Sequence, residues 1–103
     1  MVVTIFKNRI RPGIDKEYGA HVSKLLAIAQ KMPGFVSIKA YSAEDGEHLI
    51  LVEFETEQAV EAWREHPEHQ IAQQLGRSKY YSEYQVQVCQ PLRDYSFKAS
   101  ADS

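Results

Sequence analysis

The fold of this chain is decided by the stretch HLILVEFE, residues 48–55. Its apolar and β-branched residues predict a strand, in which successive side chains point to opposite faces. One face carries His48, Ile50, Val52 and Phe54, and the other carries Leu49 and Leu51. Because a strand that is apolar on both faces belongs to a sheet covered on both sides, something must pack against each face of this one.

The segments before this strand predict two more strands. Residues 35–41 alternate between apolar and polar side chains, and Asp45-Gly46 supplies turn chemistry, so residues 35–41 and 48–55 should form a hairpin. Residues 2–10 are rich in β-branched side chains and predict the first strand. Alternation puts Asn8 on the more apolar face of that strand.

Helices are predicted between the strands. After Pro12-Gly13, Asp15 can cap a helix that Pro33-Gly34 terminates. Its apolar residues recur at helical spacing: Tyr18, Val22, Leu25, Leu26, Ala29 and Met32. Thr56 can cap a second helix, which contains Trp63, and Pro67 can start a third that ends near Gly76. Residues 80–89 predict the last strand.

This order of elements predicts an α+β fold. It is the ferredoxin-like βαββαβ plan, with an antiparallel sheet, helices on one face and a second helix that is broken at Pro67. The other face of the sheet would be bare, and a homodimer whose two sheets form a barrel would bury it. We expect residues 1–91 to form the domain and residues 92–103 a C-terminal tail, either flexible or laid over a partner.

Composition narrows the classes of partner. The 103 residues suffice for one domain, and 44% hydrophobic with 25% charged residues is typical of a folded globular protein. The net charge of −2 and the absence of a lysine or arginine run argue against nucleic acid. No apolar run approaches membrane-spanning length, so no membrane partner is expected. The single cysteine, Cys89, suits a reducing compartment, and we expect a cytoplasmic protein.

Several segments together resemble a known family. They are KNRI (7–10), MPGF (32–35), EFETEQA (53–59), Trp63 and HPEH (66–69). The chain resembles the antibiotic biosynthesis monooxygenase (ABM) family of dimeric α/β-barrel proteins over residues 2–89. Some members oxidise polycyclic phenols with dioxygen and without metal or flavin, and others degrade haem, so the fold alone does not decide the chemistry.

The haem-degrading members combine an asparagine on the first strand, a tryptophan on the broken helix and an iron-binding histidine further along. Asn8 and Trp63 match the first two by position. Gln73 occupies the position where the histidine is expected, and an amide is a poor iron ligand. The resemblance therefore ranks haem chemistry behind cofactor-free oxygenation, and no cofactor or metal is expected.

The candidate catalytic residues are Asn8, Trp63, His66 and His69. The Asn8 amide can stabilise an oxyanion, Trp63 can form a flat wall, and either histidine can accept a phenolic proton. Each has a structural alternative: Asn8 can satisfy backbone groups at a strand end, Trp63 can pack on the sheet, His66 can cap the helix after it, and His69 can be solvated.

Other residues have weaker claims to a role. His48 is a further candidate, although the mouth of the hairpin is its better placement, and His21 is expected at the surface. The tyrosines at 80, 81 and 84 suit packing better than a radical or stacking cluster. Cys89 is expected to be a small apolar filler.

Three functions remain open from the residues and the resemblance. The first is a homodimeric monooxygenase that acts on a small aromatic or quinol-type molecule without a cofactor. The second is a non-catalytic binding or stress-related dimer with the same pocket. The third is a haem-binding or haem-degrading protein.

Overall fold

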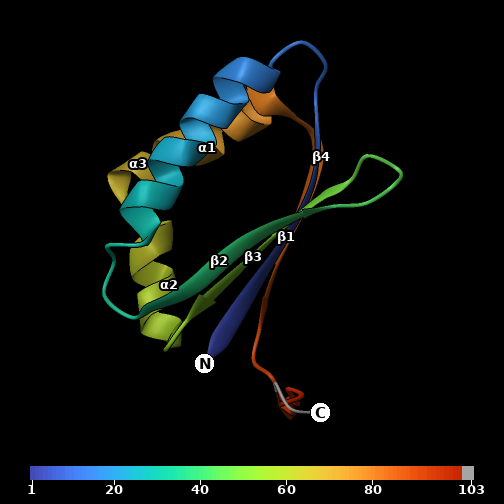
Figure 1. Cartoon of the computed structure of the whole chain (residues 1–103). Coiled ribbons are helices and arrows are strands. Elements are labelled where there is room, and N and C mark those ends of the chain that lie inside the picture. The colour runs from blue at the N-terminus through green and yellow to red at the C-terminus, as the bar shows by residue number, and fades with distance from the viewer. Residues whose placement is uncertain (101–103) are drawn as a thin grey trace.

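The computed structural model describes residues 1–100. Four strands and three helices alternate along the chain (Figure 1). Their bounds are β1 Val2–Ile10, α1 Asp15–Ala29, β2 Phe35–Ser42, β3 His48–Phe54, α2 Glu57–Arg64, α3 Pro67–Leu75 and β4 Tyr81–Cys89. One π-helical turn, η1 Gly76–Tyr80, joins α3 to β4. The predicted α+β order is confirmed.

The four strands form one antiparallel sheet in the order β2-β3-β1-β4. This is the ferredoxin-like arrangement expected from the sequence, with β1 and β3 at the centre. The register pairs Asn8 of β1 with His48 on one side and Tyr84 on the other. These three residues therefore share one face of the sheet at the same level.

That face carries the hydrophobic core. All three helices lie on this side of the sheet (Figure 1). The buried cluster joins β1 and β3 to the helices through Val2, Val52, Phe54, Ala29, Val60 and Trp63. The face of β1 and β3 that carries Val2, Val52 and Phe54 therefore packs against the helices.

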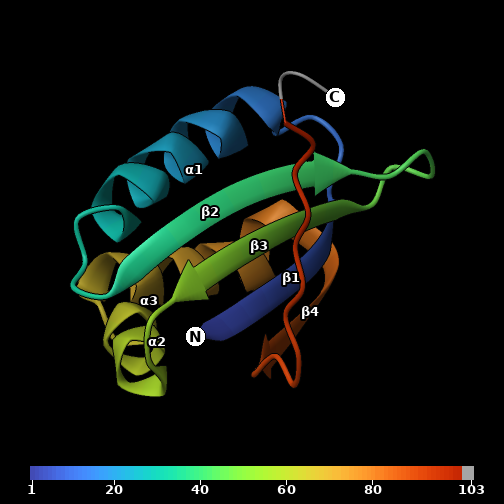
Figure 2. The same cartoon turned by 60° about the horizontal axis from the view of Figure 1, so that its bottom comes forward.

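The opposite face, which we call the open face, has no helix over it (Figure 2). On this face Ile5 of β1 pairs with Leu51 of β3, and Leu49 lies two residues before Leu51 on the same strand. All three are only half-buried. The two-sided apolar pattern of β3 is thus covered on one side alone in a single chain.

The ends of the helices follow predicted chemistry, with one difference. Thr56 caps α2 by accepting a hydrogen bond from the Ala59 N–H at 3.1 Å, and Pro67 is the first residue of α3. Asp15 is the first residue of α1 rather than its cap, a position at which its charge still favours the helix N-terminus.

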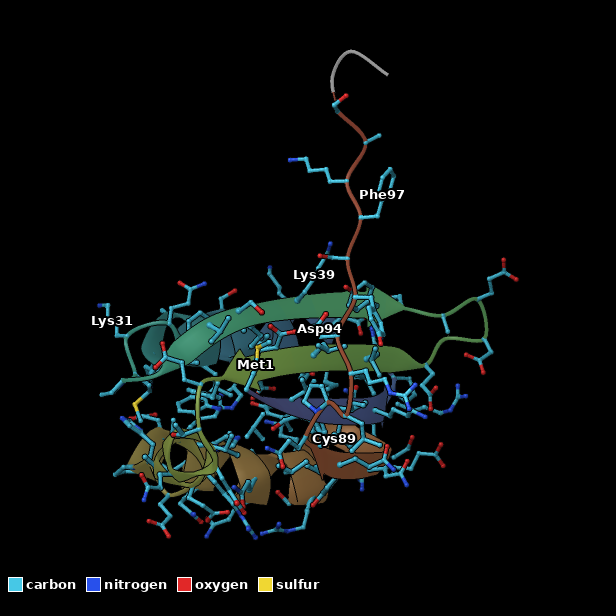
Figure 3. All side chains as sticks on the ribbon, turned by 90° about the horizontal axis from the view of Figure 1, so that it is seen from below. Met1, Lys31, Lys39, Cys89, Asp94 and Phe97 are labelled. Carbon is cyan, nitrogen blue, oxygen red and sulfur yellow. The ribbon has the colours of Figure 1, made fainter. Side chains whose placement is uncertain are left out.

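The segment after β4 forms neither helix nor strand up to residue 100. It runs across the strands on the side away from the helices, and Phe97 lies beyond the edge of the sheet (Figures 2 and 3). Leu92, Tyr95 and Phe97 are 98%, 86% and 90% exposed. The last three residues of the predicted tail, 101–103, lie outside the described part of the chain.

None of the helices within residues 1–100 combines the length and the apolar character needed to span a bilayer.

Gly34 links α1 to the sheet and provides a test of this packing. Its φ is +82°, and a Cβ there would lie 2.9 Å from the Ala59 Cβ, whereas Gly13 has φ +86° and open space around it. Gly34→Ala should therefore lower the free energy of unfolding by about 2 to 4 kcal/mol, from backbone strain plus overpacking. Gly13→Ala should cost about 1 to 2 kcal/mol, from strain alone.

Urea unfolding of both variants measures the difference. Equal losses in the two variants would show that the contact between the 34–35 turn and α2 is not tight.

Candidate functional site

Asn8 is the buried polar residue of this fold. It lies on the helix-facing side of β1, is 1% exposed, and neither its Oδ1 nor its Nδ2 has a hydrogen-bond partner. A buried polar group without a partner costs about 1 to 3 kcal/mol. A fold retains such a group at a cost to stability, which is typical of a functional site. The alternative, that Asn8 satisfies backbone groups, finds no such bond.

Tyr84, which pairs with Asn8, belongs to a group of five aromatic rings in mutual contact that we call the aromatic cluster: Phe6, Tyr18, Tyr80, Tyr81 and Tyr84. The Phe6 ring centroid lies 5.3 Å from that of Tyr81 and 5.7 Å from that of Tyr84. Tyr81 pairs with Ile10, two residues after Asn8, yet its ring reaches back to Phe6, two residues before it. Tyr84 therefore lies directly opposite Asn8 on β4, and the Tyr81 ring extends from the level of Ile10 toward Phe6.

The tyrosine hydroxyls of α1 and β4 meet inside this cluster. Tyr18 Oη and Tyr81 Oη are 2.9 Å apart, and either can donate. Burial raises the pKa of both phenols, so both stay protonated at neutral pH. Gly76 of η1 makes room for this pair, because a Cβ there would lie 2.8 Å from the Tyr81 ring.

Trp63 and His69 form a second group, where α2 meets α3. Their rings stack with centroids 4.5 Å apart and planes 8° from parallel. The Nδ1 of His69 lies 3.1 Å from the Trp63 carbonyl oxygen, which can only accept, so Nδ1 carries the proton. Burial lowers the pKa of His69. The ring is therefore neutral near pH 7, with the lone pair on Nε2.

His66 performs the capping role that was its structural alternative. Its Nδ1 accepts a hydrogen bond from the Glu68 N–H at 3.1 Å and so caps α3. Its ring centroid lies 5.8 Å from that of Trp63. His66 thus stabilises the break between α2 and α3 and helps position Trp63.

The structure divides the four sequence candidates between two places. Trp63 packs in the core cluster that includes Val2, with His66 and His69 beside it. Asn8 lies six residues after Val2, roughly 20 Å further along β1 at the rise of a strand. Register instead places Asn8 between Tyr84 and His48, so Asn8 and Trp63 have different neighbours in the structure.

Residues outside the four catalytic candidates make contacts that stabilise the fold or lie partly buried in it. His48 Nδ1 lies 3.2 Å from Ser42 Oγ at the mouth of the hairpin. Gln73 stands at the position where a haem-binding histidine is expected. Its Nε2 donates a hydrogen bond of 3.5 Å to the Arg64 carbonyl oxygen. Cys89 is a half-buried free thiol. Among residues 1–100 no three His, Cys, Asp or Glu side chains gather where they could hold a metal ion.

His21 is the residue that sequence analysis misplaced. Instead of pointing freely into solvent from α1, its ring lies 5.3 Å from that of Tyr80, and its Nε2 is buried without a partner. Burial lowers the pKa of His21, assisted by Lys24 and opposed by Glu68 and Glu17. Its spacing of three residues from Tyr18 was the available signal, since residues three apart share a helix face.

Two substitutions of His66 distinguish its capping of α3 from a role in acid–base chemistry. His66→Ala should lower the free energy of unfolding by about 1 kcal/mol, because the Glu68 N–H loses its acceptor. His66→Asn should keep wild-type stability, because an asparagine oxygen can accept the same bond. Urea unfolding compares the two, and equal stability of both variants would show that the cap contributes nothing.

Comparison with known proteins places these features in a family. Residues 1–75 match the profile of the family "Antibiotic biosynthesis monooxygenase". Protein YqjZ of Bacillus subtilis, described as uncharacterized, is 30% identical over 88 residues, covering 85% of this chain and 77% of YqjZ.

Two solved structures share the fold at lower identity. Rv0793 from Mycobacterium tuberculosis superposes with a TM-score of 0.79 at 21% identity, covering 92% of this chain and 98% of that one. A mutant of SnoaB, described as a cofactor-independent oxygenase from Streptomyces nogalater, gives 0.77 at 12% identity, covering 90% and 94%. With the profile match over three quarters of its length, the chain belongs to the antibiotic biosynthesis monooxygenase family.

Proposed function

We propose that this protein is a cofactor-independent monooxygenase that oxidises a small aromatic or quinol-type molecule with dioxygen. Family membership supports the general monooxygenase type of activity. The observation that carries the proposal is the Asn8 side chain, an amide buried at 1% exposure with no partner and flanked by aromatic rings. A flat phenol would suit both: its ring would pack against the aromatic side chains, and its hydroxyl would give the Asn8 amide a hydrogen-bond partner.

The proposed reaction requires few protein groups. Ionising a phenol makes its ring electron-rich enough to react with dioxygen. Oxidation of a ring C–H to a second carbonyl by one O₂ converts the phenol to a quinone and yields one water, so no outside reductant is needed. The protein must bind the ring, stabilise the phenolate and exclude bulk water. The aromatic cluster and Trp63 serve the first task, and the Asn8 Nδ2 hydrogens serve the second. Because His66 caps α3, His69 is the proposed proton acceptor, through the lone pair on its Nε2.

Two other functions are outcomes of the test. A binding protein with the same site would take up the phenol without consuming dioxygen. Haem chemistry would need an iron ligand, and the Gln73 amide at the expected position donates to a carbonyl instead. A Soret band on adding haemin would indicate that the protein binds haem.

We also propose a homodimer formed through the open face, in the cytoplasm as the lone Cys89 suggests. Ile5, Leu49 and Leu51 are apolar and only half-buried in a single chain, and a second sheet would cover them. The segment after β4, which carries the exposed rings of Tyr95 and Phe97, crosses the same side of the sheet and would find a surface on the partner (Figure 2).

Substituting Asn8 tests the proposed activity. Wild-type protein, without added metal or flavin, should consume dioxygen with at least one compound from a panel of naphthoquinols and polycyclic phenols. Asn8→Leu should abolish uptake and raise the free energy of unfolding by about 1 to 2 kcal/mol, because it removes a buried unpartnered amide. An oxygen electrode and urea unfolding make the two measurements.

Thr4→Val is the matched control, because Thr4 lies on the same face of β1 at the opposite end from Asn8. It should leave dioxygen uptake unchanged. Uptake no faster than autoxidation across the whole panel would rule out the oxygenase, and a destabilised Asn8→Leu protein would show that the amide is satisfied in solution.

A charge on the open face tests the dimer. Leu51→Asp should give a monomeric mass by light scattering at micromolar concentration, because a carboxylate cannot be buried between two sheets without a partner. Ile71→Asp, which alters an α3 residue that is 48% exposed, should remain dimeric. A monomeric wild-type protein would refute the proposal.

A further inference from the structure

Three aromatic rings come from the positions that surround Asn8 on its face of the sheet. Phe6 lies two residues before Asn8 on β1, and Tyr84 lies directly across from Asn8 on β4. Tyr81 pairs with Ile10, two residues after Asn8. Because side chains two residues apart on a strand share a face, Phe6 and Asn8 both point toward the helices, and Tyr84 joins them there as the cross-strand partner of Asn8.

The three rings contact one another and together span the Asn8 position. Their centroids lie 5.3 Å apart for Phe6 and Tyr81, 5.7 Å for Phe6 and Tyr84, and 5.8 Å for Tyr81 and Tyr84, each pair meeting edge to face. Since Phe6 starts before Asn8 and Tyr81 starts beyond it, the space where these two rings meet lies over Asn8. The Asn8 side chain is accordingly 1% exposed. We call these three rings the ring triad.

The members of the ring triad differ in how firmly they are held. The Tyr81 hydroxyl shares a 2.9 Å hydrogen bond with Tyr18, and a Cβ at Gly76 would lie 2.8 Å from the Tyr81 ring. Phe6 lies on β1, which has a strand on each side. Tyr84 lies on the edge strand β4 and is 41% exposed, and within residues 1–100 no hydrogen bond ties down its hydroxyl. Tyr84 is therefore the ring that can move with the least loss.

We propose that Tyr84 is the entrance to the Asn8 site: its ring covers Asn8 in the free protein and turns outward when the ring of a ligand takes its place. The inference rests on the proposed function for the class of ligand, a small phenol. The ligand ring makes the same edge-to-face contacts with Phe6 and Tyr81 that the Tyr84 ring makes in the free protein. Its hydroxyl donates to Asn8 Oδ1 or accepts from Asn8 Nδ2.

Two opposing contributions keep both positions of the Tyr84 ring accessible. The inward position keeps the contacts with Phe6 and Tyr81, but it leaves both polar atoms of Asn8 buried without a partner. The outward position loses those contacts and lets water or a ligand hydroxyl bond to the amide. Because neither position of the free protein has both kinds of contact, a ligand that supplies a ring and a hydroxyl together shifts the balance outward.

Hydrogen exchange of the Asn8 side-chain amide tests the cover in the free protein. Asn8 is the only asparagine among the 103 residues, so labelling with ¹⁵N-asparagine gives one side-chain amide signal by NMR. Its Nδ2 hydrogens should exchange slowly with water in the wild type. Tyr84→Ala should speed this exchange about tenfold or more, because it removes the covering ring. Tyr84→Phe should exchange as slowly as the wild type, because it keeps the ring.

Tyr41→Ala is the matched control. Tyr41 is 46% exposed, close to the exposure of Tyr84, but it pairs with Leu49 on the open face. This variant should leave the exchange of the Asn8 amide unchanged, and urea unfolding confirms that each variant is folded. Slow exchange in Tyr84→Ala, fast exchange in the wild type, or an equal acceleration in Tyr41→Ala would each overturn the inference.

Binding of 2-naphthol without dioxygen tests whether a ligand ring replaces that of Tyr84. Tyr84→Ala should bind it about tenfold more tightly than the wild type, because no ring has to be displaced first. The single Asn8 amide signal should shift on binding in both proteins, whereas Tyr41→Ala should bind as the wild type does. Equal or weaker binding by Tyr84→Ala, or an Asn8 signal that does not shift, would overturn the inference.

The two proposals fail in different ways. Tighter 2-naphthol binding by Tyr84→Ala, in a protein that consumes no dioxygen with any compound of the panel, would refute the oxygenase and leave the entrance standing. Dioxygen uptake by the wild type, together with slow exchange of the Asn8 amide in Tyr84→Ala, would leave the oxygenase standing and refute the entrance.

Discussion

The arrangement of the whole chain depends on covering a central strand that is apolar on both faces. β3 has Val52 and Phe54 on one side and Leu51 on the other, and it lies beside β1 at the centre of the sheet. All three helices pack on the first side because the two crossover connections of this topology run over the same face. Residues 1–100 provide no further helix for the second side, so burial there must come from another surface.

Covering one face with helices also creates the interior where the candidate site lies. At one end of β1 the interface is fully apolar, with Val2 and Phe54 buried against Trp63. At the other end the same face carries Asn8, and α1 contributes Tyr18 and His21 instead of aliphatic side chains. A leucine in place of Asn8 would make the folded state more stable. The presence of a polar residue at this position therefore indicates a requirement other than folding.

Sequence alone predicts the local features well because they depend on neighbours in the chain. Alternation placed Asn8 on the helix-facing side, and the Thr56 cap and the Pro67 helix start followed from local chemistry. The Tyr18–Tyr81 bond joins residues 63 positions apart, and no local pattern indicates it. The same holds for His21, whose burial depends on Tyr80, brought beneath α1 by a π-helical turn that the strand pattern does not suggest.

His69 and His21, of which His69 is the more deeply buried, illustrate how hydrogen bonds distinguish the possible roles of histidines. His69 donates Nδ1–H to the Trp63 carbonyl and stacks on that indole, so its tautomer and its ring plane are set by structural contacts. His21 has one nitrogen at the solvent-shielded interface with no protein partner. A base needs a lone pair, and Nε2 of His69 carries one because its Nδ1–H donates to the Trp63 carbonyl oxygen. The stacking on Trp63, a buried core residue, holds the His69 ring in one orientation, whereas the ring contact of His21 is with Tyr80.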